Sequence, residues 1–133
     1  METSNEQKRA IRAWELVNSI PDDRIEKYSS LAKSAPVMIL TNGLGQTLAY
    51  MISKSKEGNE YSTLFEHLDS WLSSNVVWSG NTSGKGKLME RVIAEDSQGY
   101  RMATEEALAF LAWIKRFAGG AKESKEEVDK QWP

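Results

Sequence analysis

The chain has 133 residues, a formal net charge of −2 at pH 7, 40% hydrophobic residues and 27% charged residues. These values predict one globular domain and exclude a disordered or fibrous protein. Cysteine is absent, which excludes disulfides and thiolate metal sites and suits the reducing cytoplasm, where we expect the protein to reside. Because the net charge gives no overall attraction for nucleic acid, any basic surface must be local.

No segment has the length of a membrane span. The longest apolar run covers residues 35–40, whereas a membrane helix requires ~20 such residues. Residues 1–9 lack the apolar core of a secretory signal. We therefore expect neither a membrane anchor nor a leader.

Apolar residues recur at helical spacing from the start of the chain. Ile11, Trp14, Val17 and Ile20 follow one another at intervals of three, which predicts an amphipathic helix with these side chains facing the core. Pro21 ends this helix because proline denies the next turn a hydrogen-bond donor.

A second helix is predicted between two prolines. It begins with Pro21 and the acidic pair Asp22–Asp23, which are typical of a first helical turn. Its inner face carries Ile25, Tyr28, Leu31 and Ala32. We expect it to end at Pro36, because a proline in a helix interior removes a hydrogen bond and clashes with the preceding turn.

A third helix is predicted over residues 40–52, where apolar residues keep helical phase. It contains Gly43 and Gly45, which each cost ~1 kcal/mol relative to alanine inside a helix. Their small size should therefore be needed, either for the close approach of a neighbouring helix or for that of a ligand backbone.

Three more helices are predicted over residues 64–72, 88–93 and 100–117 from the same apolar spacing. Residues 73–86 contain three glycines together with several Ser, Thr and Asn residues, which predicts a long loop. The pair Gly119–Gly120 is expected to end the last helix, since glycine commonly follows a helix C-terminus.

The predicted elements indicate an all-α fold, a compact single-domain bundle of about six helices. The glycine pair divides the chain into a helical domain, residues 1–120, and a second segment, residues 121–133. That segment is predicted to be either a charged C-terminal tail or an extension of the last helix.

No arrangement of residues indicates catalysis. His67 is the only histidine, and we interpret it as a surface or boundary residue, because histidine bases and ligands need oriented partners. The adjacent acids Asp22–Asp23 and Glu105–Glu106 point about 100° apart on a helix, so neither pair can share a proton or a metal. Residues 80–86 lack the spacing of a phosphate loop and the Ser or Thr that should follow Lys85. We expect no catalytic residue, no metal and no cofactor.

The five tryptophans divide by position. Trp14, Trp71 and Trp113 fall on or beside apolar helix faces and are expected in the core. Trp78 and Trp132 lie outside the predicted helices, where an exposed ring would act as a docking anchor or a stacking platform. For Trp78 we favour packing against the core.

Two segments carry more than helical periodicity. Residues 31–50 contain the run Asn42-Gly43-Leu44-Gly45-Gln46 ahead of an apolar helix. Residues 100–118 contain Glu106-Ala107-Leu108-Ala109-Phe110-Leu111 and continue to Lys115-Arg116-Phe117. Together they resemble the small subunit of the Cmr complex, the type III-B CRISPR effector, and the likeness spans roughly residues 10–118.

The resemblance implies an all-helical subunit of an RNA-guided antiviral assembly that recognises and cuts invading transcripts. In that family the small subunit is not the nuclease, and the repeated backbone subunits cleave the target. Copies of the small subunit stack head to tail beside the large, polymerase-like subunit and help to line the groove that holds the guide–target duplex. The implied partners are the large subunit, the backbone subunits, further copies of this chain, the guide RNA and the target RNA.

A groove along an RNA backbone needs positive charge and contacts that do not depend on sequence. The candidate RNA-binding residues are Asn42, Gln46, Lys54, Lys56, Lys85, Lys87, Arg91, Arg101, Lys115 and Arg116. The resemblance contributes the two amides and the last three bases, and the others are basic residues outside the matching segments. Helix capping by Asn42 and stabilisation of a helix C-terminus by Lys115–Arg116 remain structural alternatives.

Two other functions stay open. A protein-only scaffold or adaptor subunit would space its neighbours without contacting RNA, and the net charge of −2 is compatible with it. A nuclease that uses carboxylates and a metal is the second, although no suitable group of acids is visible. If RNA contact is correct, we expect affinity to arise mainly from a continuous basic stripe formed when copies stack.

Overall fold

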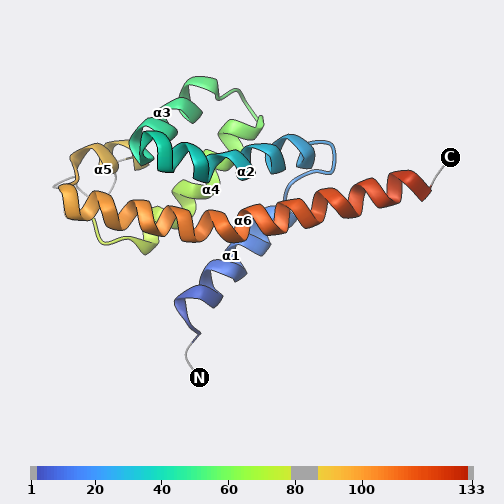
Figure 1. The fold of residues 1–133 in the computed structure, drawn as a ribbon, viewed down its shortest axis with the longest axis horizontal. Coiled ribbons are helices and arrows are strands. Elements are labelled where there is room, and N and C mark those ends of the chain that lie inside the picture. Colours follow the sequence, from blue (N-terminus) through green and yellow to red (C-terminus); the bar gives the residue numbers. More distant parts are fainter. Residues whose placement is uncertain (1–2, 79–86, 132–133) are drawn as a thin grey trace.

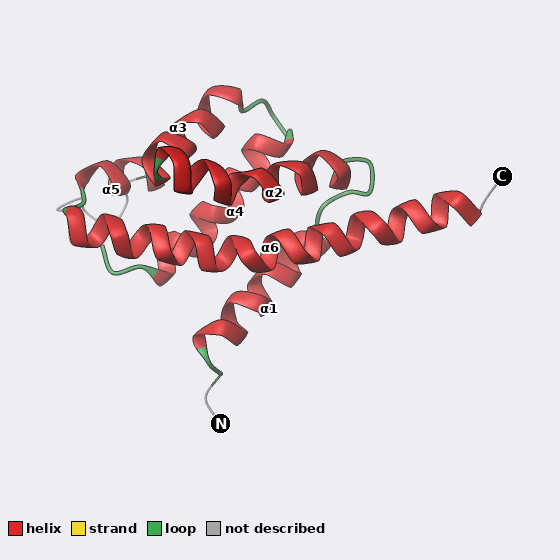
Figure 2. Ribbon diagram, in the orientation of Figure 1, coloured by secondary structure: helices red, strands yellow, loops and turns green. Residues whose placement is uncertain are grey.

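A computed structural model describes residues 3–78 and 87–131, which form α-helices and no strand (Figures 1 and 2). The helices are α1 (Asn5–Asn18), α2 (Ile25–Asn42), α3 (Leu44–Lys54), α4 (Glu60–Asn75), α5 (Leu88–Ala94) and α6 (Ser97–Gln131). The predicted all-α, single-domain bundle is confirmed. Among the described helices, none combines the length and the apolar character that crossing a membrane requires.

The 35-residue helix α6 runs the length of the molecule, and the other helices gather around its first two thirds (Figure 1). Helix α2 lies along α6, whereas α1 crosses it. Helices α3 and α4 pack on α2, and the short helix α5 lies at the end where α6 begins. The last turns of α6 project beyond the bundle (Figure 1).

One carboxylate ties three helices together. Arg9 of α1 donates two hydrogen bonds to Glu106 of α6, with N–O distances of 2.6 and 2.9 Å. The Trp71 indole of α4 donates a third, at 2.9 Å. Burial alone would raise the pKa of Glu106, but the hydrogen bonds from Arg9 and Trp71 hold it below its usual value. Trp71 also stacks on Phe110 of α6, with ring centroids 5.1 Å apart.

Helix α2 continues through Pro36, so the predicted break there is wrong. Ala35 and Ile39, on either side of the proline, are buried in the core. Their burial offsets the ~3 kcal/mol that an interior proline costs. The break falls instead at Gly43, whose φ of 91° is a backbone conformation that favours glycine. The single helix predicted over 40–52 is therefore divided between α2 and α3.

Tyr100 of α6 explains why the corner between α2 and α3 contains glycines. The Gly45 amide donates to the Tyr100 hydroxyl at 2.8 Å. A Cβ atom added at Gly43 would lie 3.0 Å from that oxygen, and one added at Gly45 would lie 3.5 Å from it. Of the two predicted reasons for small residues here, the close approach of a neighbouring helix is the one observed.

Helix α6 also departs from prediction, because it does not end at Gly119–Gly120. It continues without a break as far as Gln131, so residues 121–131 are helical. A Cβ atom added at Gly119 or Gly120 would meet nothing within 4 Å. Nothing in the described bundle therefore requires these two residues to be small.

The apolar stripe predicted on α1 is only partly buried. Ala13 and Val17 lie in the core, whereas Ile11 and Trp14 are 54% and 55% exposed. Since α1 crosses α6, only part of its apolar face is covered. The expectation that Trp14 is a core residue is wrong.

The loop predicted over residues 73–86 begins later than expected, because α4 extends to Asn75. Trp78 packs against the core and its indole donates to the Leu72 carbonyl oxygen at 3.2 Å, in agreement with the favoured interpretation. The phosphate-loop segment 80–86 and Trp132 lie outside the described residues.

We predict that Gly43→Ala lowers the free energy of unfolding by about 1–3 kcal/mol, because alanine is strained at this positive φ and its Cβ would press on Tyr100. The matched control is Gly119→Ala, which should raise stability by up to ~1 kcal/mol, because its Cβ enters open space on a helix. Urea unfolding followed by circular dichroism measures both. Equal stability of the two variants would contradict this explanation of the corner.

Candidate nucleic-acid interface

Asn42 and Gln46 are brought together at the corner between α2 and α3. Both are exposed, and both line a cavity of about 560 Å³. The remaining lining residues are Met38, Thr41, Thr47 and Tyr50. The described lining carries no charged group, so this cavity could meet RNA only through polar contacts and not through ion pairs with phosphate.

Lys54 lies one helical turn beyond Tyr50, at the end of α3. Its Nζ atom is 5.9 Å from the centroid of the Tyr50 ring, a cation–π arrangement. Lys56 is exposed in the connection between α3 and α4. Neither cation is among the described residues that line the uncharged cavity, although Lys54 contacts the ring of its lining residue Tyr50.

The candidates on and before α5 differ from one another. Lys87 is exposed at the N-cap position of α5. Arg91 is half-buried, and its guanidinium donates to the Ser73 carbonyl oxygen at 3.1 Å, which holds α5 against the end of α4. Lys85 lies outside the described residues. Arg91 thus has a structural task that sequence reasoning did not anticipate.

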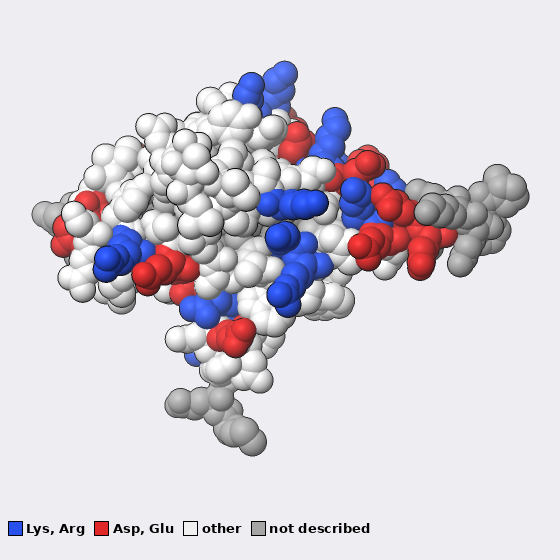
Figure 3. Space-filling view, viewed as in Figure 1, with Lys and Arg blue, Asp and Glu red and all other residues white. Residues whose placement is uncertain are grey.

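The last three candidates lie on α6. Arg101, Lys115 and Arg116 are all exposed. Arg101 and Lys115 project within ~40° of each other and lie ~21 Å apart along the helix axis. Glu105 is exposed between them. Figure 3 shows Lys and Arg interspersed with Asp and Glu along α6.

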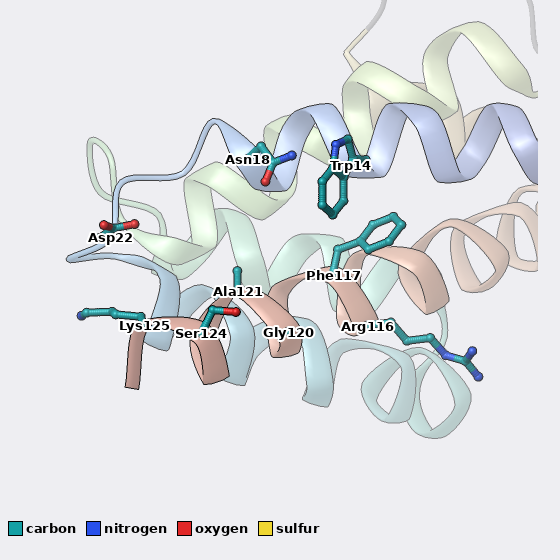
Figure 4. A pocket seen from close by; sticks show the side chains of 9 residues that line it. All are labelled: Trp14, Asn18, Asp22, Arg116, Phe117, Gly120, Ala121, Ser124 and Lys125. Atoms are coloured by element: carbon teal, nitrogen blue, oxygen red, sulfur yellow. The ribbon is translucent and has the colours of Figure 1, made fainter. Parts of the chain in front are cut away.

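A groove that the sequence did not predict lies between α1 and α6. Figure 4 shows the Trp14 ring pointing from α1 toward α6, beside Phe117, with the ring centroids 5.1 Å apart. The cavity has a volume of about 750 Å³. Its lining comprises Trp14, Asn18, Asp22, Arg116, Phe117, Gly120, Ala121, Ser124 and Lys125. In the sequence, the pair Gly119–Gly120 is the one feature that could have indicated this groove, but by itself the pair predicts the end of a helix.

His67 is buried, with 8% of its surface exposed, so its assignment as a surface or boundary residue is wrong. Its Nδ1 atom and the Tyr28 hydroxyl are hydrogen-bonded at 2.7 Å. Burial, and secondarily the positive charge of Arg12, lowers the pKa of His67 to about 4. Burial raises the pKa of Tyr28. Neutral His67 and protonated Tyr28 therefore form an uncharged polar pair that joins α4 to α2.

Metal binding has no visible basis in residues 3–78 and 87–131, where no three His, Asp or Glu side chains lie close enough to hold an ion. The acids Glu105 and Glu106 face different surroundings, since Glu105 is exposed and Glu106 is occupied by Arg9 and Trp71. The described surface therefore offers cavities and dispersed charges, without a cluster of acids that would hold a metal ion.

Comparison with known proteins identifies the family. The family model described as CRISPR-associated protein (Cas_Cmr5) matches residues 5–121. The chain belongs to the Cmr5 family. A crystal structure of a CRISPR-associated Cmr5 family protein from Thermus thermophilus is similar to this Cmr5 chain, with a TM-score of 0.67 and 25% sequence identity over 90% of this chain and 98% of that one. The resemblance to a small subunit of the type III-B Cmr complex is confirmed.

We predict that stability falls as pH is lowered from about 6.5 to about 4, by ~1 kcal/mol per pH unit and ~3 kcal/mol in all. The unfolded chain binds a proton on His67 in this range, whereas the folded chain does not, so protonation favours unfolding. Urea midpoints at pH 7.5, 6.5, 5.5 and 4.5 measure the slope.

The control for the pH dependence is His67→Gln, which keeps a polar partner for Tyr28 but cannot titrate. The variant should be less stable at pH 7.5 and nearly independent of pH between 6.5 and 4.5. The same slope in both proteins would show that other groups are responsible.

Proposed function

We propose that this Cmr5-family chain is a non-catalytic subunit of a cytoplasmic RNA-guided ribonucleoprotein. Several copies stack beside the large subunit and help to line the groove that holds the guide–target duplex. The observation that carries this proposal is the family match over residues 5–121. The large subunit, the repeated backbone subunits, guide RNA and target RNA are the proposed partners.

The exposed side of α6 supports contact with an RNA backbone. Arg101 and Lys115 are exposed there and separated by ~21 Å along the axis. Charge contacts of this kind are independent of sequence and weaken with salt. The net charge of −2 and the exposed acid Glu105 limit the affinity of one copy. Stacking would multiply such contacts along one duplex.

An uncharged face supports contact with neighbouring protein subunits. Residues 34–53 contain no charged side chain, although they span the second half of α2 and nearly all of α3. Val37 and Leu40 on this stretch are 61% and 75% exposed. Figure 3 shows a broad uncharged area over these helices. Exposed apolar area of this kind fits a protein interface better than a surface that faces phosphates.

The same face favours the alternative function, a protein-only scaffold or adaptor subunit that never contacts RNA. In that case the exposed bases of α6 would be solvated helix residues without a task. The two functions differ in whether charge reversal on α6 alters RNA binding.

We predict that a gently purified, tagged copy of this chain recovers a large polymerase-like subunit, repeated backbone subunits and an RNA of discrete guide length. Mass spectrometry identifies the proteins, and sequencing identifies the RNA. A matched strain that carries the tag alone is the control. Recovery of this chain without other Cmr subunits would contradict its proposed place in the assembly.

We further predict that R101E/K115E lowers the affinity of the assembled complex for target RNA and reduces the slope of log affinity against log salt concentration. The isolated chain should bind RNA weakly, and tight binding by the dilute monomer at physiological salt would contradict the stacking model. The control is K8E/K27E, which reverses two exposed lysines on α1 and α2 and should leave the slope unchanged. If R101E/K115E binds target RNA as the control does, Arg101 and Lys115 do not contact RNA, and the protein-only scaffold gains support.

A further inference from the structure

The groove between α1 and α6 exposes an aromatic surface that folding leaves uncovered. Trp14 is 55% exposed, although it contacts the half-buried ring of Phe117 edge-on. Phe117 in turn lies 5.6 Å from Trp113, so three rings follow one another along the helix junction. A large ring is normally covered on folding, because its burial is strongly favourable. An accessible face on Trp14 therefore offers a platform for a partner.

Across the groove from Trp14, helix α6 presents a residue without a side chain, Gly120. Gly120 lines the cavity in the middle of a long helix, where glycine is unfavourable. Apart from its own helical segment, no described atom lies within 4 Å of the position that its Cβ would take. This differs from Gly43 and Gly45, whose space is taken by Tyr100. A planar group that enters between Trp14 and α6 would use the space at Gly120.

Polar and charged groups surround this apolar floor. Arg116 and Lys125 lie at the two ends of the α6 segment that lines the groove, and Asp22 is the one acid among the described lining residues (Figure 4). The Asn18 amide and the Ser124 hydroxyl add donors and acceptors. The volume of about 750 Å³ is within the range of pockets that hold small ligands.

We propose that this α1–α6 groove binds one unpaired nucleotide of RNA. Its base stacks on Trp14 above Gly120, and its flanking phosphates meet Arg116 and Lys125. Single-stranded RNA sites combine an aromatic platform with cations in this way. The inference rests on the proposed RNA contact. It adds a second kind of contact, because Arg101 and Lys115 are proposed to contact the RNA backbone, whereas the groove would bind a base.

A second kind of occupant, a segment of a protein subunit, is less favoured by the lining. The described lining carries two cations and one acid around one strongly exposed ring, Trp14. A docked amphipathic helix would instead need an apolar surface for a row of anchors at i, i+3, i+4 and i+7. The uncharged face of α2 and α3 is the better protein-binding surface.

The experiment fills the groove without removing any side chain. Gly120→Leu places a branched side chain beneath Trp14, whereas Gly119→Leu places the same side chain on the same helix outside the lining. Both should fold with a raised melting temperature, because leucine replaces glycine in a helix and meets no atom near its Cβ. Binding of an unstructured eight-nucleotide RNA is measured at low salt by anisotropy and by quenching of tryptophan fluorescence.

We expect Gly120→Leu to weaken binding of the single-stranded RNA by about five- to hundredfold, with Gly119→Leu unchanged. Trp14→Leu should cause a similar loss and remove the quenching. Ile11→Ala, which alters an equally exposed apolar residue of α1 outside the lining, should cause neither effect. A blunt RNA duplex without unpaired bases should bind all four variants like the unmodified chain.

Several outcomes would overturn the inference. If the unmodified chain binds RNA and Gly120→Leu binds it equally well, the groove holds no base, while the proposed backbone contact stands. If Gly120→Leu still binds RNA but no longer enters the assembled complex, the groove belongs to a protein subunit. If the unmodified chain binds no RNA, alone or in the complex, the proposed RNA contact itself is wrong.

Discussion

The Glu106 carboxylate is the contact on which the arrangement of the bundle depends. It lies mostly out of solvent, and a charge in that position must be matched by hydrogen-bond donors. Arg9 and Trp71 supply these donors from α1 and α4, so one side chain of α6 sets the positions of two helices. Helix α1 is held at Glu106, in the first third of α6, and its Trp14 side chain lines one groove together with Gly120.

The part of the surface that the structure describes includes three regions with different chemistry. The side of α6 that carries Arg101 and Lys115 has exposed charge of both signs. The face of α2 and α3 is uncharged and partly apolar over residues 34–53. The groove between α1 and α6 combines exposed aromatic area with two cations. The proposed contacts with protein neighbours and with RNA would fall on different regions, since phosphates and apolar protein surfaces select opposite environments.

The sequence indicated some of the surroundings of the candidate interface residues and not others. Asn42 and Gln46 lie four residues apart in one short motif, but they belong to different helices, and the corner at Gly43 brings both to one cavity. The sequence gives no sign that Arg91 holds the Ser73 carbonyl, or that His67 is paired with Tyr28. These contacts join residues 18 and 39 positions apart. Local spacing carries no information about such partners.

The sequence by itself determined the helical class, most of the helix positions and the family, because apolar periodicity and short motifs are local properties of the chain. The tertiary structure decided that α2 passes through Pro36, that α6 passes through Gly119–Gly120 and that Trp14 is exposed while His67 is buried. A helical pattern shows that one face is apolar, but the crossing of another helix determines how much of that face is covered. Burial of Ala35 and Ile39 likewise outweighs the local cost of Pro36, and that burial exists only once the helices have packed.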